Sequence, residues 1–571
     1  MREHSAGEAL RVRELCRQLK PVIGARADRI WMAYVIEDKD GKAQILDYLE
    51  VLAAQHFQGT LENEGPGLLP PSTEAARGEY ELGTVTYNGR DLHPLGLRES
   101  EWIQHVGVFG RSGAGKTNLG FLVVQELVKA GKPVLILDWK RNYRDLLTLP
   151  GFENTAVYTI GRAVSPLSFN PLIPPPGTSP QTWLKKVIAV LGHSYLLGDG
   201  VAYLLQEAID RAFEEAGVYT GSVDRWPTFK EVLEILKRRQ VSGREAGWMS
   251  SALRALASLC FGEMDTLVNQ GHDDIRSLLS RPVILELDAL TQPDKVFVAS
   301  TLVLYIHHLR MTEPVRETLK SVLLIEEAHH ILSGERQSLA GGQSVMDIAF
   351  REIREFGTGI VLLDQMPSTI TASALANTYA VLCFNLKHRA DVSAISQAML
   401  LEDQEKDILG RLQVGEAVVR LQGRGVRPFM IHVPEFAIHK GSISDAQVMV
   451  HMRQLGLLSD RRRAVLRTVS VANVADSLQE PATDPEWPTH SLPEAAFLAD
   501  VAAFPDSGIA ERYRRLGLSV RQGQRIKDAG IEKGLISEEI HTTRMGKIRV
   551  VRLTDQGRLL VDHPDSRPEA A

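Results

Sequence analysis

The sequence predicts an α/β fold in which helices wrap a parallel sheet. From His105 onward, short apolar runs alternate with helical stretches, a pattern typical of buried parallel strands joined by helices. Residues 110–117, Gly-Arg-Ser-Gly-Ala-Gly-Lys-Thr, stand between an apolar run at His105–Phe109 and an amphipathic stretch at Asn118–Lys129. Strand, glycine loop and helix therefore follow one another in the order that a phosphate-binding loop needs.

This loop predicts a site for the phosphates of a nucleotide. Gly110 and Gly115 let the backbone fold tightly enough to aim its N–H groups at phosphate oxygens. Lys116 is expected to reach the outer phosphates, and the Thr117 hydroxyl to ligate Mg²⁺. We therefore expect a nucleoside triphosphate, most often ATP, as the ligand. The residues expected to bind it are Gly110, Arg111, Ser112, Gly113, Ala114, Gly115, Lys116, Thr117 and Asn118.

The bulk composition narrows the class of protein. The chain has 571 residues, of which 44% are hydrophobic and 24% charged, which allows a large core and about three or four domains. No apolar run reaches the roughly 20 residues of a membrane span, and Met1–Arg13 is polar, so we expect a cytoplasmic protein without a membrane partner. Three scattered cysteines indicate neither a disulfide framework nor a cysteine metal site. Because the net charge is −6, nucleic-acid contacts would have to come from local patches or from oligomerisation.

Five segments are expected along the chain. Residues 1–95 are predicted to be an accessory region with helices at Glu8–Lys20 and Ile30–His56 and a hairpin-like segment at Thr84–Asn88. Residues 96–440 are expected to form the α/β core, with a helical insertion at about 175–280. A helical extension (441–478), a linker (479–492) and a winged-helix-like domain (493–571) follow. Further buried strands are expected at Val134–Leu137, Val283–Leu287, Val322–Ile325, Gly359–Leu363, Val381–Leu386, Ala417–Leu421 and Phe429–Val433.

The winged-helix-like tail carries an excess of positive charge. Residues 511–558 contain 12 Lys and Arg against 6 Asp and Glu. Such a module contacts DNA or RNA in some proteins and other proteins in others, and both readings stay open. The candidate contact residues are Arg521, Arg525, Lys527, Lys547 and Arg549.

Two acids after a buried strand are the candidates for chemistry. Glu326 and Glu327 follow the run Val322–Ile325, and hydrolysis needs an acid near the metal and a group that orients water. We expect Glu326 to hold Mg²⁺, through water, and Glu327 to polarise the attacking water. Gln365, just after the next strand, is the candidate sensor of the γ-phosphate. His329 and His330 either sense the nucleotide, contact a neighbouring subunit or are structural.

Several arginines and lysines are candidates for contacts with phosphate. Arg351 and Arg354 stand three apart on one helical face, and either could complete a neighbour's site as an arginine finger, with Arg389 in reserve. The alternative is that they form solvated ion pairs. For contacts with duplex DNA, the candidates in loops are Lys140, Arg141, Arg144, Arg336 and Gln337.

An ordered set of motifs resembles a known family. The segments GRSGAGKTN, LILDWK, FNPL (Phe169–Leu172), LLIEEAHH, REIREFGTGIVLLDQMPS and NTYAVLCFNL are similar to the HerA branch of the HerA/FtsK superfamily of ring-shaped DNA-pumping ATPases, over about residues 80–435. The resemblance implies a RecA-like P-loop NTPase core, a hexamer with nucleotide at the subunit interfaces, and double-stranded DNA in a central channel. Two features depart from the family: residues 1–75 look helical where the family has a small β-barrel, and the tail is added.

The resemblance leaves two functions open. The leading hypothesis is a motor that couples ATP hydrolysis to movement of duplex DNA, together with a partner nuclease or defence effector. The second is a nucleotide-controlled scaffold that activates a partner enzyme without moving DNA. Conjugation-type ATPases share the FNPL segment and also stay open. The sequence shows no cluster of acids with a lysine that would indicate a nuclease site in this chain.

Overall fold

The computed structural model describes residues 2–57, 68–221, 223–334, 344–458, 492–505, 507–516, 518, 520–543, 546–555 and 558. The chain divides into two compact units, Met1–Asn473 and Val474–Ala571, which are described separately below. Within the described ranges, no helix combines the length and the apolar character needed to cross a membrane.

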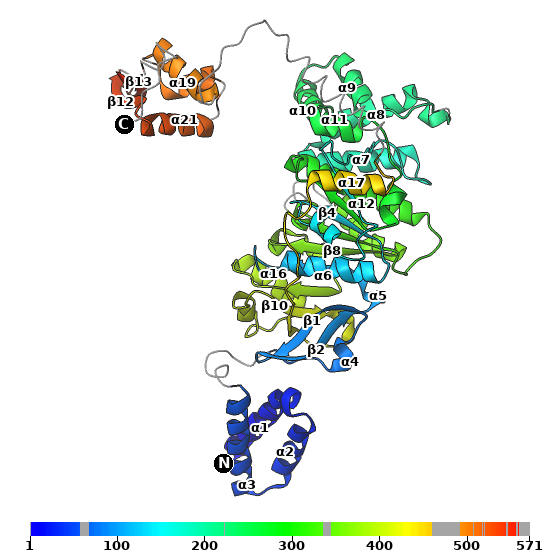
Figure 1. Cartoon of the computed structure of the whole chain (residues 1–571), viewed down its shortest axis with the longest axis vertical. Helices are drawn as coiled ribbons and strands as arrows, with labels where there is room; N and C mark the ends of the chain where they lie inside the picture. Colours follow the sequence, from blue (N-terminus) through cyan, green and yellow to red (C-terminus); the bar gives the residue numbers. More distant parts are fainter. Residues whose placement is uncertain are drawn as a thin grey trace. The chain divides into compact units, whose positions relative to one another are not determined.

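An eleven-stranded sheet forms the centre of the larger unit (Figure 1). Its order is β2-β1-β11-β10-β9-β3-β8-β7-β4-β6-β5, and the seven strands from β9 to β5 are parallel. Each buried strand expected from the apolar runs is present, whereas β5 had not been predicted. The parallel strands are β3 (Val106–Phe109), β4 (Val134–Asp138), β5 (Ala156–Thr159), β6 (Val283–Glu286), β7 (Ser321–Glu326), β8 (Thr358–Asp364) and β9 (Ala380–Cys383).

The other edge of the sheet is antiparallel, which the sequence analysis had not predicted. Its strands are β10 (Glu416–Leu421), β11 (Phe429–His432), β1 (Tyr80–Tyr87) and β2 (Arg90–Leu97). The loop between β10 and β11 is too short for the crossover that a parallel pair requires, so the chain turns back on itself. The hairpin β1–β2 pairs with β11 and therefore extends the core sheet. The boundary predicted at residue 95 is wrong in this respect, because it separates the hairpin from the sheet to which it belongs.

Helices cover the sheet and extend it at one end. Around the sheet lie α5 (Glu99–Trp102), α6 (Lys116–Lys129), α12 (Gln292–Met311), α14 (Val345–Glu352), α15 (Ala372–Ala376), α16 (Arg389–Met399) and α17 (Asp445–Gln454), and α4 (Thr73–Ala76) packs on β2. The insertion consists of α7 (Pro180–Tyr195), α8 (Asp199–Glu215), α9 (Phe229–Arg238), α10 (Arg244–Leu259) and α11 (Gly262–Val268). Figure 1 shows its later helices gathered at the end of the unit away from the β1–β2 hairpin. Asn170 of the FNPL segment fastens the insertion, because its side chain donates to Pro227 O at 2.9 Å.

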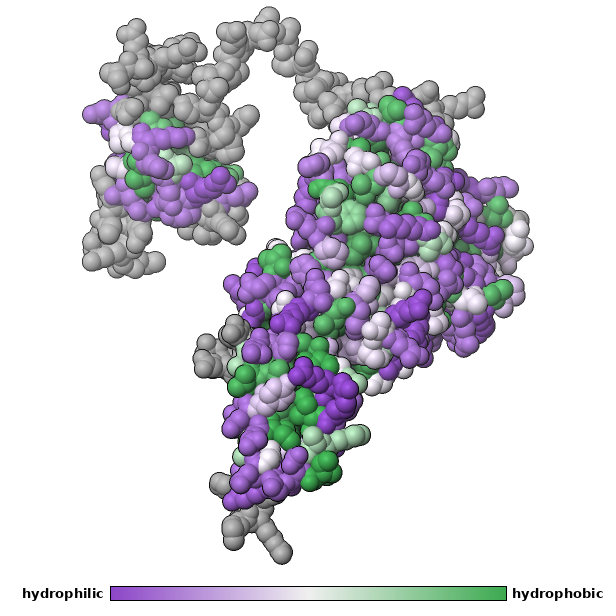
Figure 2. Space-filling view, turned by 60° about the horizontal axis from the view of Figure 1, so that its bottom comes forward, coloured by the Kyte–Doolittle hydropathy of each residue, from purple (hydrophilic) through white to green (hydrophobic). Residues whose placement is uncertain are grey.

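The first residues form three helices, α1 (Arg2–Ile23), α2 (Ala25–Ile36) and α3 (Lys39–His56). The single helix predicted over Ile30–His56 is interrupted, because Asp38 caps α3 by accepting a hydrogen bond from Gly41 N at 2.9 Å. Met32, Val35 and Ile36 lie at helical spacing on one side of α2 and are 57–83% exposed. Figure 2 shows hydrophobic residues gathering on the surface of this part of the unit. We call Met32, Val35 and Ile36 the α2 patch; exposed apolar patches are typical of contact surfaces for proteins.

The second unit has helices first and a hairpin last. Its elements are α19 (Leu492–Ala503), α20 (Ile509–Arg515), α21 (Val520–Glu532), β12 (Ile536–Thr543) and β13 (Gly546–Leu553). The order from α20 to β13 is the predicted one, and α19 precedes it. Asp500 of α19 pairs with Arg512 and Arg515 at 2.7 and 2.6 Å. Two of the twelve cations counted in residues 511–558 thus share one carboxylate from outside that window, which offsets one of their two charges.

Candidate functional site

The parallel strands bring the sequence-predicted acids to one edge of the sheet. β8 lies between β3 and β7, and Phe109 of β3 is level with Asp364 of β8. Glu326 of β7 is level with Leu363, one residue earlier in β8. Because all these strands end at the same edge, the glycine loop after β3, Glu327 after β7 and Gln365 after β8 lie around one cavity. This cavity, which we call the phosphate cavity, has a volume of about 750 Å³.

The glycine loop has the backbone that phosphate binding requires. Gly115 has a φ of +120°, and a Cβ added there would lie 3.1 Å from the Phe384 ring, so a side chain is excluded. Lys116 donates to Gly110 O at 2.7 Å and to Arg111 O at 2.9 Å, which folds its ammonium over the loop. Burial lowers the pKa of Lys116 to about 8, and a bound phosphate would favour the charged form.

The residues expected to hold Mg²⁺ fit that ion. Thr117 and Glu326 both line the phosphate cavity. Glu326 is 6% exposed, and its Oε2 atom is buried without a hydrogen-bond partner. Burial and the nearby Asp138 carboxylate raise the pKa of Glu326, so a cation would relieve an unfavourable carboxylate. The described residues contain no group of three or more His, Cys, Asp and Glu that could hold a metal. Mg²⁺ takes one or two protein oxygens together with water and phosphate, and the Thr117 hydroxyl and the Glu326 carboxylate would supply them.

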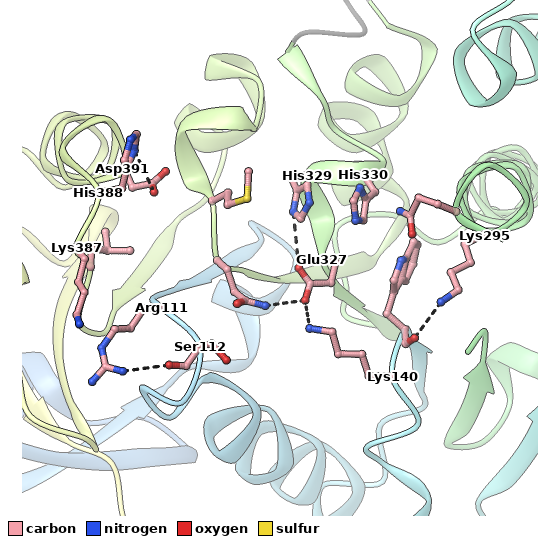
Figure 3. A pocket seen from close by; sticks show the side chains of 15 residues that line it. Arg111, Ser112, Lys140, Lys295, Glu327, His329, His330, Lys387, His388 and Asp391 are labelled. Carbon is pink, nitrogen blue, oxygen red and sulfur yellow. Dashed lines mark hydrogen bonds and ion pairs between the residues drawn. The ribbon is translucent and has the colours of Figure 1, made fainter. Parts of the chain in front are cut away.

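Glu327 is held by donors from two neighbouring strands. It has a φ of +49°, in the left-handed region, so the extended strand β7 ends directly after Glu326. Gln365 Nε2 donates to Glu327 Oε1 at 2.7 Å, and Lys140 Nζ forms an ion pair with the same oxygen (Figure 3). The Glu327 side chain is 14% exposed. The side chain predicted to polarise water and the predicted sensor therefore contact each other directly, through a bond that the sequence had not indicated.

The two histidines lie beside this group. His329 N and Nδ1 bond Asp364 Oδ2 at 2.7 and 2.9 Å. Burial lowers the pKa of His329, but the Asp364 and Glu327 carboxylates outweigh it and leave the pKa above its ordinary value. His330 stacks on Trp139 with ring centroids 6.1 Å apart. Of the readings left open for these histidines, these contacts favour a structural one.

Some residues of the site had no sequence signal, or only a weak one. Asn385 follows β9 as Gln365 follows β8; its Oδ1 accepts from Arg111 Nε at 3.0 Å, and its own amide donates to Gly410 O and Leu412 O, both at 3.0 Å. A polar residue after an apolar strand was the available clue. Asn118, expected to bind nucleotide, uses its side chain to hold Pro434 O and Phe436 N at 2.8 and 2.6 Å. That contact holds the segment after β11 at the phosphate cavity, where the end of β11 and this segment add the lining residues His432, Val433, Glu435 and Lys440.

The candidate arginine fingers lie at the opposite edge of the sheet. Arg351 and Arg354 precede β8, near the amino ends of the strands. His105 anchors this region: it donates from Nε2 to Phe350 O at 2.7 Å and accepts from Ile360 N at 3.1 Å. Among the described residues that line the phosphate cavity, neither arginine is present. Arg389, the reserve candidate, is exposed at the start of α16.

Two predicted DNA contacts are wrong, because the side chains are buried in ion pairs. Arg144 is 3% exposed and bonds Glu286 at 2.6 and 2.5 Å and Asp445 at 2.6 Å. Lys527 is 3% exposed and pairs with Glu538 at 3.1 Å. Lys140, Arg141 and Arg525 are exposed. Arg336, Gln337 and the side chains of Arg521, Lys547 and Arg549 lie outside the described residues.

Comparison with known proteins identifies the core. Residues 80–303 match the family model described as "Helicase HerA, central domain". The match begins at the first residue of β1, in agreement with the place of the hairpin in the core sheet. The central region is HerA-like. No curated protein matches the chain.

Two solved structures are similar to the chain, and the first supports the fold. VirB4 of Thermoanaerobacter pseudethanolicus is 16% identical over 66% of this chain and 98% of its own, with a TM-score of 0.50. The bacterial conjugative coupling protein TrwBΔN70 is 13% identical over 65% of this chain and 92% of its own, with a TM-score of 0.48. The expected α/β fold with a P-loop NTPase core is confirmed. The HerA match ends in α12, before Glu326, Glu327 and Gln365, so the roles of those residues rest on geometry.

The burial of Arg144 yields a testable prediction. Arg144→Ala should lower the free energy of unfolding by about 3 kcal/mol, because it leaves the fully buried Glu286 carboxylate without one of its partners. Arg141→Ala, a neighbouring exposed position, should change it by less than about 0.5 kcal/mol. Thermal and urea unfolding of both variants would measure the difference. Unchanged stability of Arg144→Ala together with weaker DNA binding would restore the sequence-based assignment.

Proposed function

We propose that this HerA-like protein is an ATPase that assembles as a ring, most simply a hexamer, and moves along double-stranded DNA. One observation carries the proposal: Lys116, Thr117, Glu326, Glu327 and Gln365 line a single cavity at the carboxyl edge of the sheet. This set contains a group for each requirement of phosphoryl transfer to water. The family description "Helicase HerA" adds support for a DNA substrate.

Each residue of the cavity has a distinct part in the proposed hydrolysis of ATP. Lys116 and the loop N–H groups bind the phosphates of the substrate, and Lys116 counters the charge that builds on the transferred group. Thr117 and Glu326 hold Mg²⁺, which when bound neutralises charge on the phosphate oxygens. Glu327 accepts a hydrogen bond from the attacking water and turns it toward the γ-phosphorus. Gln365 fixes the orientation of Glu327 through the 2.7 Å bond and so links the end of β8 to the reacting water.

The ring is proposed from the position of the arginines. Arg351 or Arg354 would have to act across a subunit interface, because both precede β8 and lie toward the edge opposite to the phosphate cavity. A guanidinium from a neighbouring subunit would add charge stabilisation in the transition state.

Partners are proposed from two surfaces. The α2 patch is suited to docking a partner protein, such as a nuclease or a defence effector. In the second unit, the exposed Arg525 on α21 remains a candidate for contact with nucleic acid or with an acidic partner, in keeping with a winged-helix role.

A second function is a nucleotide-controlled scaffold that activates a partner enzyme without moving DNA. The α2 patch favours it, since a docked effector needs such a surface but a motor alone does not. Both functions require ATP hydrolysis, so only a measurement of movement separates them.

The first prediction concerns hydrolysis itself. With Mg²⁺ present, Glu327→Gln should bind ATP but turn it over at least about 100-fold more slowly, because the amide is a poor acceptor for the water proton. Lys116→Ala should weaken ATP binding. Glu153→Gln, on the exposed surface, should behave as the wild type. Phosphate release and nucleotide binding would be measured for all four proteins. Normal turnover by Glu327→Gln would contradict the assignment of Glu327 as the residue that orients the attacking water.

The second prediction concerns the subunit interface. Alone, an arginine-finger variant, Arg351→Ala or Arg354→Ala, should lose on the order of 10³-fold in turnover. Mixed with inactive Lys116→Ala subunits it should regain part of the activity, because some interfaces then combine an intact cavity with an intact arginine. Arg316→Ala, an exposed residue of the same region, is the control and should be active alone. Absence of recovery for both arginines, with mixed rings verified by tagged subunits, would refute action in trans.

The third prediction separates the motor from the scaffold. A third strand annealed to duplex DNA should be displaced by the wild type with ATP, since a protein moving along the duplex pushes it off. Glu327→Gln should leave the triplex intact, which controls for displacement by binding alone. ATP hydrolysis by the wild type without displacement would favour the scaffold.

A further inference from the structure

A second cavity lies on the other side of Glu327 (Figure 3). Its volume is about 620 Å³, and its lining comes from the glycine loop, the loops after β4, β7, β8 and β9, and the first turn of α12. It shares Ser112, Lys140, Glu327 and Gln365 with the phosphate cavity. We call it the cationic cavity, because its lining includes Arg111, Lys140, Lys295 and Lys387 against two carboxylates, Glu327 and Asp391.

The positive charge in this cavity is only partly compensated. Arg111 donates to neutral groups, Asn385 Oδ1 at 3.0 Å and Ser112 O at 3.2 Å. Lys295 donates to the carbonyl oxygen of Trp139 at 3.2 Å, and its burial lowers its pKa. Asp391 is occupied by the Ser368 hydroxyl and N–H at 2.6 and 3.0 Å. Of the four cations in the lining, only Lys140 is paired with a carboxylate in the contacts described above, which makes the cavity a site for anions.

The spread of the cations indicates an extended anion. Figure 3 shows Arg111 and Lys387 on one side of the cavity, Lys295 on the other, and Lys140 with Glu327 between them. A single small ion would reach few of these groups at once. A chain of phosphates, as in a nucleic-acid backbone, could contact cations on both sides, and such contacts would be indifferent to base sequence.

Lys140 connects this cavity to the reacting centre. Its ammonium and the Gln365 amide both engage Glu327 Oε1, so this oxygen is occupied and less accessible to a water molecule. The Lys140 side chain is 55% exposed and can turn without disturbing the core. A phosphate in the cationic cavity offers Lys140 another partner. Glu327 would then keep its bond from Gln365 and its contact with His329 at 3.8 Å, and lose the ion pair with Lys140.

We propose that the cationic cavity binds backbone phosphates of nucleic acid, and that Lys140 transmits this binding to Glu327, so that hydrolysis is restrained until nucleic acid is bound. This inference rests on the proposed ATPase function and names the site through which DNA regulates it. Lys140 is thus a positioning residue that acts through Glu327. Lys295, Lys387 and Arg111 supply the remaining contacts.

The link is tested with Lys140→Met, which keeps an unbranched side chain one atom shorter and removes its charge. Without DNA, this variant should turn over ATP roughly 2- to 5-fold faster than the wild type, the range expected for loss of a partly exposed ion pair. Addition of a short duplex should stimulate the wild type but give little further increase in Lys140→Met. Arg141→Met, next in the chain and outside the cavity lining, is the control and should respond to DNA as the wild type does.

The binding site is tested with Lys295→Met and Lys387→Met. Both should require more DNA for half-maximal stimulation and lower the salt dependence of DNA binding by about one unit of log–log slope each. Unchanged DNA response in both variants would overturn the site. So would a loss of subunit assembly in place of a loss of DNA response, because the cavity would then be a contact between copies of the chain.

The outcomes separate this inference from the proposed function. Lower DNA-free turnover in Lys140→Met would overturn the restraint, since the lysine would then be needed for the substrate itself. Full DNA stimulation in Lys140→Met, with normal dependence of hydrolysis on Glu327, would overturn the link alone and leave the ATPase proposal standing. Absence of wild-type hydrolysis with and without DNA would instead refute the proposed function, and the inference with it.

Discussion

The site depends on one constraint, the parallel alignment of β3, β4, β7 and β8. Parallel strands end at the same edge, so residues separated by more than 200 positions in the chain meet there, from Lys116 to Gln365. The register decides which of them touch. Because Glu326 is level with Leu363, the positive φ of Glu327 brings its carboxylate within 2.7 Å of the Gln365 amide. A shift of register by one residue would reverse the faces of β7 and separate this pair.

The sequence predicted most of this architecture because its signals are local. Each buried strand from β3 to β11 except β5 followed from an apolar run, and the glycine loop followed from spacing alone. The antiparallel edge could also have been predicted locally, because the link between β10 and β11 is too short for a parallel connection. The hairpin β1–β2 was assigned to the wrong segment because its pairing with β11 spans more than 300 residues.

The errors in the site have a common physical origin. Arg144 was expected to contact DNA from a loop, and Lys527 to contact nucleic acid or an acidic partner from the expected recognition helix. Their partners Glu286 and Glu538 are distant in sequence or on another element, so burial of the pairs could not be deduced. The same holds for Lys140: its charge was noted, but its contact with Glu327 arises only when β4 lies beside β7. Sequence patterns indicate which side chains are candidates for binding or catalysis. The pairing of strands in the sheet determines which charged side chains form ion pairs and which stay exposed.

The segment after β11, the last strand of the core, is hydrogen-bonded to α6 and to the segment after β4. Asn118 holds Pro434 and Phe436, and Asp145 accepts from Gly441 N and Ile443 N at 2.7 and 3.0 Å. Arg144 then grips Asp445 at the start of α17. Arg144 and Asp145 lie in the segment after β4, four and five residues beyond Lys140. A displacement of α17 would therefore be transmitted to the segment after β4, whose Lys140 contacts Glu327.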